Sequence, residues 1–328
     1  MHFGLGPIGA AIVKQVAARP GFKIVGAVDI DAAKIDRDLG DVVGLPKRLN
    51  VTVSGDAAKA LKKAKPHVVV LCTSSSIRKV MPQIETILKS KTPIVSTTEE
   101  LSYPGYTHIR QARAIHALAK KAKVAVLGTG VNPGFAMDAL PIALTAVCER
   151  VDRVVVHRVQ DARIRRLPFQ QKIGAGLTTE QFQKKVDDGS VRHVGLTESI
   201  AMIADALGWT LDRISDDIQP KLASVTISSE FLAVDPGYVC GIIQDGVGYR
   251  KGEPVIKLHM EAYLGSPETY DSVEIEGSPN LSMKVAGGIH GDVATASIVV
   301  NSIPKVLAAP AGLHTMRDLP LPSFFPGR

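Results

Sequence analysis

Three glycines and one aspartate near the start of the chain have the spacing of a dinucleotide-binding site. Gly4, Gly6 and Gly9 form the pattern G-x-G-x-x-G, and Asp29 lies 20 residues beyond Gly9. In this pattern the glycines permit a tight turn, close approach of a pyrophosphate and close packing of a helix, while the carboxylate binds the adenosine ribose. The phosphates then lie at the N-terminus of the helix. The expected cofactor contacts here are Gly4, Gly6, Pro7, Ile8, Gly9 and Asp29.

The segments around this motif have the lengths and patterns of an alternating α/β fold. Residues 10–18 have the apolar stripe of a helix, and residues 22–28 are rich in β-branched types. The apolar run 67–72 is typical of a parallel strand covered on both faces. Hydroxyl side chains follow it, at the strand end that borders the ligand crevice in open α/β sheets. We expect Thr73, Ser74 and Ser75 to contact the cofactor; the alternative is that they only cap a helix at 77–90.

Two adjacent glutamates follow the next expected strand, residues 93–97. Thr98 at this strand end is a further expected cofactor contact. Glu99 and Glu100 lie where a carboxylate could act as a general base on a bound substrate. The alternative is that both are first-turn carboxylates, which the helix dipole stabilises. We therefore treat Glu100 and Glu99 as the candidate catalytic residues.

A glycine-rich loop at 128–135 follows the expected strand 124–127. The amide of Asn132 could hold the nicotinamide or the substrate, although Asn before proline is also an ordinary turn residue. Phe135 could line the substrate pocket or belong to the core. We expect this loop to contact the cofactor through Asn132 and the substrate through Phe135.

The pattern of elements predicts two domains. Up to residue 135 it indicates a Rossmann domain with a doubly wound parallel sheet. Between 136 and 289 strands dominate, and we expect a second, α+β domain with an open mixed sheet that binds the substrate and forms a dimer. Its strands are expected near 153–160, 221–231, 238–248, 254–263 and 270–286, with helices near 178–187 and 197–207. The second helix should be capped by Thr197. The apolar helix within 290–328 is expected to pack back on the first domain.

Composition narrows the class of protein. The 328 residues are 45% hydrophobic and 22% charged, as in ordinary globular proteins. Three scattered cysteines without a CxxC pattern indicate a reducing compartment, so we expect a cytoplasmic protein. Neither the cysteines nor the histidines have metal-ligand spacing, and we expect no metal. The net charge of +7 is dispersed, and no apolar run approaches a membrane span. Nucleic acid and membrane are therefore not expected partners.

Seven segments together resemble the 2,4-diaminopentanoate dehydrogenase family, whose relatives include native amine dehydrogenases and proteins described as dihydrodipicolinate reductase-like. They are GLGPIG at 4–9, VDID at 28–31, RDLG at 37–40, STTEELSYP at 96–104, GTGVNPGF at 128–135, RRLPFQQKIGAGL at 165–177 and HVGLTESI at 193–200. The resemblance covers nearly the whole chain. True dihydrodipicolinate reductases carry a His-His pair and a Ser-Gly-Thr motif, which residues 157–176 lack, and this argues against that activity.

The resemblance implies NAD(P)-dependent oxidative deamination of a small amine or diamino acid to a ketone and ammonia, and the reverse reductive amination. It also implies a homodimer and a catalytic glutamate in the 96–104 motif, for which we favour Glu100 over Glu99. It places Arg158, Gln160 and His193 around the substrate. If Arg158 lines the cavity, its guanidinium could bind a carboxylate in a bidentate manner; otherwise it lies on a solvated strand.

Asp29 favours NAD, because its charge accepts hydrogen bonds from the ribose and repels a 2′-phosphate. Lys34 and Arg37 nearby could offset that repulsion, so either NAD or NADP is expected as the cofactor. Two other functions stay open. One is a dihydrodipicolinate reductase-like imine reductase, and the other is a non-catalytic NAD(P)-binding sensor.

Overall fold

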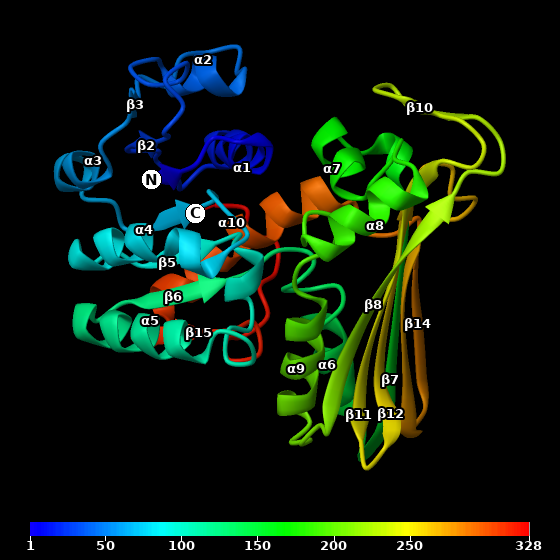
Figure 1. Cartoon of the computed structure of the whole chain (residues 1–328). Coiled ribbons are helices and arrows are strands. Elements are labelled where there is room, and N and C mark those ends of the chain that lie inside the picture. The colour runs from blue at the N-terminus through cyan, green and yellow to red at the C-terminus, as the bar shows by residue number, and fades with distance from the viewer. Residues whose placement is uncertain (328) are drawn as a thin grey trace. The chain divides into compact units, whose positions relative to one another are not determined.

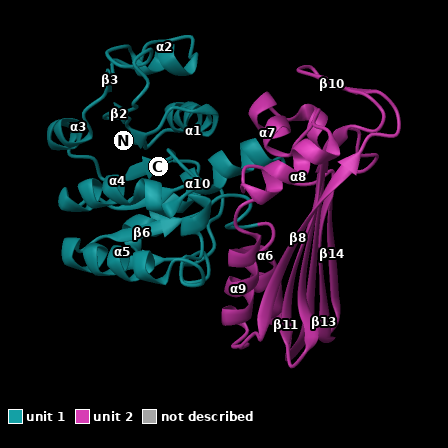
Figure 2. Cartoon of the chain, viewed as in Figure 1, with its two compact units in different colours: residues 1–135, 290–328 teal, residues 136–289 magenta. Residues whose placement is uncertain are grey.

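The computed structural model describes residues 1–327, and the chain divides into two compact units. Unit 1 combines Met1–Phe135 with the chain from His290 onward, and unit 2 is Ala136–Ile289 (Figure 2). Each unit has its own sheet.

Unit 1 contains a seven-stranded parallel sheet in the order β15-β6-β5-β4-β1-β2-β3 (Figure 1). Its strands are β1 (His2–Phe3), β2 (Ala27–Val28), β3 (Val53–Ser54), β4 (Val69–Leu71), β5 (Ile94–Ser96), β6 (Ala125–Gly128) and β15 (Gly312–His314). Strands β4, β5 and β6 are buried along their whole length, as expected when helices cover both faces of a parallel sheet. This arrangement confirms the predicted Rossmann-type sheet.

Amphipathic helices connect these strands. They are α1 (Pro7–Ala18), α2 (Leu39–Val43), α3 (Ala57–Ala64), α4 (Ile77–Lys89), α5 (Ile109–Ala122) and α10 (Gly291–Ala308), with a 3₁₀ turn η1 (Glu99–Leu101). Helix α4 shows why they pack: Ile77, Val80, Ile84 and Ile87 recur at helical spacing and are fully buried in the core.

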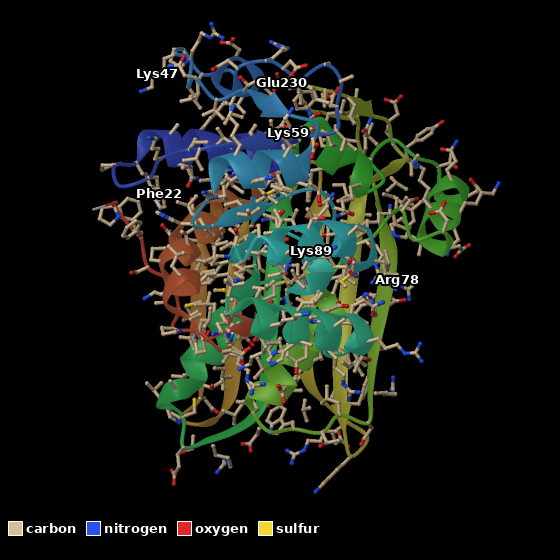
Figure 3. All side chains as sticks on the ribbon, turned by 90° about the vertical axis from the view of Figure 1, so that its left-hand side faces the viewer. Phe22, Lys47, Lys59, Arg78, Lys89 and Glu230 are labelled. Atoms are coloured by element: carbon tan, nitrogen blue, oxygen red, sulfur yellow. The ribbon has the colours of Figure 1, made fainter. Side chains whose placement is uncertain are left out.

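Helix α10 lies against α1 in unit 1, although almost 300 residues separate them in the chain. Gln15 Nε2 donates to Ser297 Oγ (3.0 Å), and Arg19 Nη1 donates to Asn301 Oδ1 (2.6 Å). The ring of Phe22, labelled in Figure 3, packs edge-on against Phe325 at 5.5 Å. These contacts hold the C-terminal segment on unit 1.

Unit 2 contains a six-stranded mixed sheet in the order β14-β13-β7-β12-β11-β8, in which only β7 and β12 pair in parallel. Its strands are β7 (Arg150–Asp161), β8 (Arg213–Leu222), β11 (Val239–Arg250), β12 (Glu253–Tyr263), β13 (Tyr270–Ser278) and β14 (Leu281–Ala286). A separate two-stranded sheet joins β9 (Ile227–Ser228) and β10 (Ala233–Val234). The predicted open mixed sheet is confirmed.

Within unit 2, α9 (Leu196–Ala206) covers one face of this sheet. The packing is close, since a Cβ added at Gly246 or at Gly248 would lie 2.8 Å from the Ile200 side chain of this helix. Along β12, buried and half-buried residues alternate, which is the signature of a sheet packed on one face. The other helical segments of unit 2 are α6 (Ala139–Leu144), η2 (Thr145–Val147), η3 (Ala162–Ile164), α7 (Leu167–Lys172) and α8 (Thr179–Asp187).

Three expectations about strands were wrong. The strand expected at 22–28 is only Ala27–Val28, and Phe22, outside the strand, packs on Phe325. The strand expected at 221–231 ends at Leu222, and the chain then turns away into β9. Residues 270–286 form a hairpin, because Pro279 in the Ser278–Leu281 turn interrupts the run.

The expected cap of α9 was also wrong. Its N-cap is Gly195, at φ +108°, with no side-chain capping bond. The Thr197 hydroxyl instead donates to Glu198 Oε2 (2.8 Å). A left-handed backbone conformation at the N-cap suits glycine, and the Thr197 side chain does not cap α9.

Basic side chains of unit 1 come from separate elements. Lys47 follows α2, Lys59 lies on α3, and Arg78 and Lys89 lie at opposite ends of α4 (Figure 3). Within residues 1–327, no helix combines the length and the apolar character needed to cross a membrane.

Candidate active site

The glycine turn at the end of β1 has room for a phosphate group at one position and none at the other two. Gly4 has φ +87°, and a Cβ there would lie 2.4 Å from Cys72 O; at Gly9 a Cβ would lie 2.0 Å from Gly4 O. A Cβ at Gly6 would meet no atom within 4 Å. Gly6 therefore faces open space beside the N-terminus of α1, and this geometry fits a dinucleotide pyrophosphate.

Asp29 lies at the end of β2, with both carboxylate oxygens held by backbone amides. Oδ2 accepts from Leu5 N (2.7 Å) and Oδ1 from Asp31 N (2.9 Å), and Lys34 Nζ lies 3.5 Å from Oδ2. Burial alone would raise the pKa of Asp29, but these hydrogen bonds and the Lys34 charge lower it below its ordinary value. Asp29 is therefore an oriented anion at the carboxyl end of β2.

The hydroxyl residues after β4 and β5 hydrogen-bond within unit 1. Thr73 Oγ1 donates to Gln83 Oε1 (2.6 Å), and Ser74 Oγ accepts from Ser76 N (3.2 Å). Thr98 Oγ1 is buried and accepts from Ser96 Oγ at 2.9 Å. Ser76, the N-cap of α4, makes no side-chain capping bond, so the cap of this helix comes from elsewhere.

That cap is Glu100, on the η1 turn after β5. Glu100 Oε2 accepts the backbone N–H of Ile77 at 2.8 Å and lies 3.1 Å from His108 Nε2. Glu100 N donates to Ser75 O (3.2 Å), which ties the ends of β4 and β5 together. Oε1 makes no hydrogen bond to any of residues 1–327, and the side chain is 24% exposed. One oxygen of Glu100 is thus anchored, and the other is available.

Glu99 lies one residue earlier on the same turn. Its carbonyl oxygen accepts from Ser102 N (3.1 Å) and from Ser102 Oγ (2.8 Å), which closes the 3₁₀ turn. Both glutamates are partly exposed, and the Glu100 carboxylate accepts from the first N–H of α4.

The loop after β6 is buried and closely packed. Thr129 is 3% exposed, and its hydroxyl has no hydrogen-bond partner within the described chain. Val131 N lies 3.4 Å from Thr295 Oγ1 of α10, so α10 holds the loop in place. Asn132 and Phe135 are both half-buried in this loop, with the Asn132 Oδ1 atom buried.

Arg158 lies inside unit 2 and is not in water. It is 2% exposed, and Nη1 donates to Asp271 Oδ1 at 2.5 Å while Nη2 donates to Ile289 O at 2.9 Å. Arg158 and Asp271 are direct cross-strand partners on β7 and β13. The alternative of a solvated strand arginine was therefore wrong. Burial lowers the Arg158 pKa, while Asp271 opposes that shift.

Gln160 and Arg165 lie beside Arg158. Gln160 Nε2 donates to Ile289 O (3.3 Å), and Gln160 Oε1 accepts from Arg165 Nη1 (2.9 Å). The Arg165 guanidinium stacks over the Phe169 ring at 4.0 Å. Gln160 thus bridges a second buried arginine to the same carbonyl that Arg158 binds.

His193 is held between α8 and α9 by Gln244. His193 N donates to Gln244 Oε1 (2.9 Å), and Gln244 Nε2 donates to Asp216 Oδ1 (2.8 Å). The ring Nε2 is buried without a partner in the described chain. Burial lowers the His193 pKa well below its ordinary value, with further lowering by the positive charges of Lys172, Arg158, Arg192 and Arg165. The imidazole is therefore neutral near pH 7.

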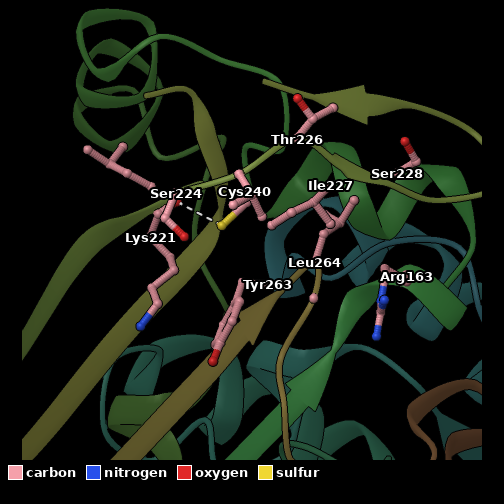
Figure 4. Close-up of a pocket in the computed structure, with 12 residues that line it drawn as sticks. Arg163, Lys221, Ser224, Thr226, Ile227, Ser228, Cys240, Tyr263 and Leu264 are labelled. Atoms are coloured by element: carbon pink, nitrogen blue, oxygen red, sulfur yellow. Dashed lines mark hydrogen bonds between the residues drawn. The ribbon is translucent and has the colours of Figure 1, made fainter. Parts of the chain in front are cut away.

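A cavity of about 380 Å³ lies elsewhere in unit 2, at the end of β8 and β12 (Figure 4). Lys221, Tyr263 and Cys240 line it, together with the segment that leads into β9. None of the expected site residues lines this cavity. Among residues 1–327, no group of three or more His, Cys, Asp or Glu side chains could hold a metal ion.

Sequence reasoning did not identify His108, Asp271, Arg165 or Thr129. His108 lies eight residues after Glu100, with no motif that marks it. Asp271 depends on the pairing of β13 with β7, which the chain order does not reveal. Arg165 belongs to the segment RRLPFQQKIGAGL, but the sequence does not reveal that its side chain is buried.

Both parts of the chain match described protein families. Residues 135–327 match the family described as the 2,4-diaminopentanoate dehydrogenase C-terminal domain, and residues 3–129 match the dihydrodipicolinate reductase N-terminus. A 2,4-diaminopentanoate dehydrogenase of Acetoanaerobium sticklandii is 36% identical over 97% of this chain and 92% of its own length. An amine dehydrogenase of Streptomyces virginiae is 24% identical over 97% of this chain and 95% of its own length.

Solved structures agree with these matches. The amine dehydrogenase of Mycobacterium smegmatis superposes with a TM-score of 0.89 at 25% identity, covering 100% of this chain and 97% of that one. A dipicolinate-bound dihydrodipicolinate reductase from Paenisporosarcina sp. TG-14 has a TM-score of 0.54 at 15% identity, with 96% of each chain covered. The second likeness concerns the fold alone.

Proposed function

Because this chain belongs to the 2,4-diaminopentanoate dehydrogenase family and is a nicotinamide-dependent amine dehydrogenase, we propose that Glu100 is its general base, acting through Oε1. The observation that carries this proposal is the unequal use of the two carboxylate oxygens. Oε2 is held by Ile77 N and His108, whereas Oε1 makes no hydrogen bond within the described chain. An anchored carboxylate with one available oxygen is suited to repeated proton transfer.

The proposed chemistry needs a base at two points. Glu100 first takes a proton from the substrate ammonium, so that a neutral amine is present when the C–H bond breaks, and this proton passes to solvent. When bound, the nicotinamide would supply the acceptor for the hydride that leaves the carbon bearing the nitrogen. Glu100 then takes a proton from the water that attacks the iminium carbon and returns it to the nitrogen of the resulting carbinolamine. As the C–N bond breaks, the hydroxyl proton of the carbinolamine passes to Glu100, which leaves a ketone and ammonia. Reductive amination is the reverse sequence.

Glu100→Gln and Glu99→Gln form a matched pair that tests this assignment. We expect Glu100→Gln to lower kcat for ammonia-dependent oxidation of NAD(P)H by about 10²- to 10⁴-fold. Binding of NAD(P)H, measured by its fluorescence, should stay unchanged, and Glu99→Gln should stay within a few-fold of wild type. The reverse result would transfer the role to Glu99. Loss of neither activity would exclude both glutamates.

We propose that unit 1 holds the cofactor through the glycine turn and Asp29, with Thr73, Ser74, Ser75, Thr98 and Asn132 as further contacts, and that NAD is preferred over NADP. The oriented charge of Asp29 supports this preference because it repels a 2′-phosphate. Lys34 lies 3.3 Å from Asp31 and 3.5 Å from Asp29, and partly offsets that repulsion. Asp29→Ser should raise kcat/KM for NADP relative to NAD, whereas Lys34→Met should lower it. A ratio that moves in neither variant would remove both residues from cofactor selection.

We propose that the region around His193 receives the far end of the substrate, with Arg158, Gln160 and Phe135 as further substrate residues. Burial and four cations lower the His193 pKa, and Asp271 and Asp216 pair with two of these cations, Arg158 and Arg192. The charges of Lys172 and Arg165 favour a negative group in this region. A diamino acid fits such a region better than a plain amine. Ammonia-dependent turnover of 2-amino-4-oxopentanoate should therefore exceed that of cyclohexanone and short alkanones. A preference for the uncharged ketones would contradict a carboxylate-bearing substrate.

We propose that unit 2 forms a homodimer through the sheet face opposite α9. This face carries half-buried Ile243 and Val247 beside His259, whose ring lies 2.9 Å from Asp245 and 3.0 Å from Glu261. Apolar residues among paired charges of both signs are suited to a self-complementary interface. Val247→Glu should yield a monomer by light scattering. A monomeric wild type would overturn the proposal.

A further inference from the structure

Within residues 1–327, the side chain that pairs with the Glu100 carboxylate is that of His108. His108 lies outside the 96–104 motif. Its Nε2 lies 3.1 Å from Glu100 Oε2, and the two side chains are 15% and 24% exposed. The other contact of Oε2 is a backbone amide, Ile77 N. His108 is therefore the one group holding Oε2 that a substitution can remove without altering the main chain.

The main chain of His108 is fixed by its place in the fold. His108 is the N-cap of α5, its N–H donates to Pro104 O (3.0 Å), and its carbonyl accepts from Ala112 N (2.9 Å). N-cap side chains ordinarily accept a hydrogen bond from their own helix. The His108 side chain makes no such bond and contacts Glu100 instead. The contact with Glu100 is thus not a by-product of helix capping.

The surroundings of the ring favour one protonation state. His108 Nδ1 is buried and has no partner within residues 1–327. A proton on Nδ1 would leave a buried donor without an acceptor, which is costly. The neutral tautomer with its proton on Nε2 avoids this and donates that proton to Glu100 Oε2. Imidazolium would need both nitrogens protonated, so His108 is suited to donate a hydrogen bond and unsuited to relay a proton.

We propose that His108 is a positioning residue for the amine dehydrogenase reaction. As a neutral donor to Glu100 Oε2, it holds the carboxylate in its ionised form and leaves Oε1 toward the reacting atoms. This inference rests on the proposed role of Glu100 as base.

Three substitutions at His108 separate donation from mere packing. The amide nitrogen of His108→Gln can reach the place of Nε2, whereas the shorter amide of His108→Asn cannot, and His108→Leu has no donor. We expect kcat to fall about tenfold in the Leu and Asn variants, and less than about threefold in the Gln variant. The KM for the cofactor should stay unchanged. His67→Leu, at an exposed histidine of unit 1, is the matched control.

The pH profile of kcat/KM is the readout that a purely structural role would not move. Its acidic limb reports ionisation of the base in the free enzyme. We expect this limb to move in His108→Leu, because the carboxylate loses a donor, and to stay in place in His108→Gln. A merely structural histidine would lower the melting temperature of all three variants and leave the limb unmoved.

Glu100→Gln, measured in parallel, distinguishes the two possible failures. If Glu100→Gln is inactive while His108→Leu keeps the wild-type kcat and pH profile, this inference is overturned and the proposed base stands. If Glu100→Gln is active, Glu100 is not the base, and the proposed role of His108 is contradicted as well. If His108→Leu costs nothing further in the Glu100→Gln background, His108 acts through Glu100, as proposed.

Discussion

The two units hold their candidate site charges in different ways. In unit 1 the Glu100 carboxylate is 24% exposed and has one oxygen without a hydrogen bond in the described chain. In unit 2 the Arg158 guanidinium is 2% exposed and paired with Asp271. Glu100 lies on the η1 turn after β5, whereas Arg158 lies inside strand β7. Arg158 is paired with a buried counter-charge, whereas Glu100 keeps one oxygen without a hydrogen bond in the described chain. This difference predicts that replacing Glu100 alters kinetics, whereas removing the partner of Arg158 alters stability.

The largest effect should follow from removing the partner of Arg158. Asp271→Asn leaves a guanidinium buried without its counter-charge, and breaking such a pair costs about 3–5 kcal/mol of unfolding free energy. Chemical denaturation of the variant would measure this loss. Glu274→Gln, at an exposed glutamate on the same strand, is the control and should change stability little. A loss below about 1 kcal/mol in Asp271→Asn would mean that Arg158 is not held by this pair.

Within unit 1, two glycines of one turn should respond differently. Gly9→Ala places a Cβ 2.0 Å from Gly4 O, and we expect it to lower the unfolding free energy by about 3 kcal/mol. Gly6→Ala meets no atom within 4 Å, so it should leave stability near wild type and weaken NAD(P)H binding, as measured by fluorescence titration. Equal destabilisation by both would show that Gly6 does not face a ligand.

Both units contain a buried histidine, which should make both sensitive to acid. Burial, aided by the Met1 amino group, lowers the pKa of His2 from 6.5 to about 3. The unfolded chain takes up a proton below pH 6.5 that the folded chain refuses. Stability is therefore full above pH 6.5 and falls with decreasing pH, by about 2 kcal/mol at pH 5 from His2 alone. His193 in unit 2 acts in the same direction.

His2→Val tests the contribution of unit 1. The loss of unfolding free energy between pH 7.5 and pH 5 should be about 2 kcal/mol smaller in this variant than in wild type. The same pH dependence in both proteins would show that His2 is protonated in the folded state.

The smallest effect should come from Glu100. Glu100→Gln retains an oxygen that can accept from Ile77 N, and the side chain is partly exposed, so we expect less than about 1 kcal/mol of lost stability. Denaturation of the variant whose kcat is measured would check this. A loss above about 3 kcal/mol would place Glu100 with Arg158, as a structural charge, and would end the contrast between the units.

Local spacing carried most of what could be predicted in unit 1. The glycine pattern, Asp29, and the polar residues after 67–72 and 93–97 depend on the rule that carboxyl ends of parallel strands meet at one edge. Strand bounds were less predictable: of residues 22–28, Ala27–Val28 form the strand, while Phe22 packs on Phe325, far along the chain. The Gly195 cap of α9 was missed because left-handed backbone at that residue has no local marker beyond glycine itself.

The amino-acid sequence by itself determined the parallel sheet, the phosphate-binding turn, the mixed sheet of unit 2 and the family, since all of these depend on periodicity and on residues near one another in the chain. Only the tertiary structure decided which charges are available. Arg158 is neutralised by a partner 113 positions away, because β13 pairs with β7 in that register. Glu100 is anchored on one oxygen because α4 and His108 converge on it. Whether a charged side chain can bind a ligand depends on its contacts with residues far away in the chain. The spacing of residues along the sequence does not encode these contacts directly.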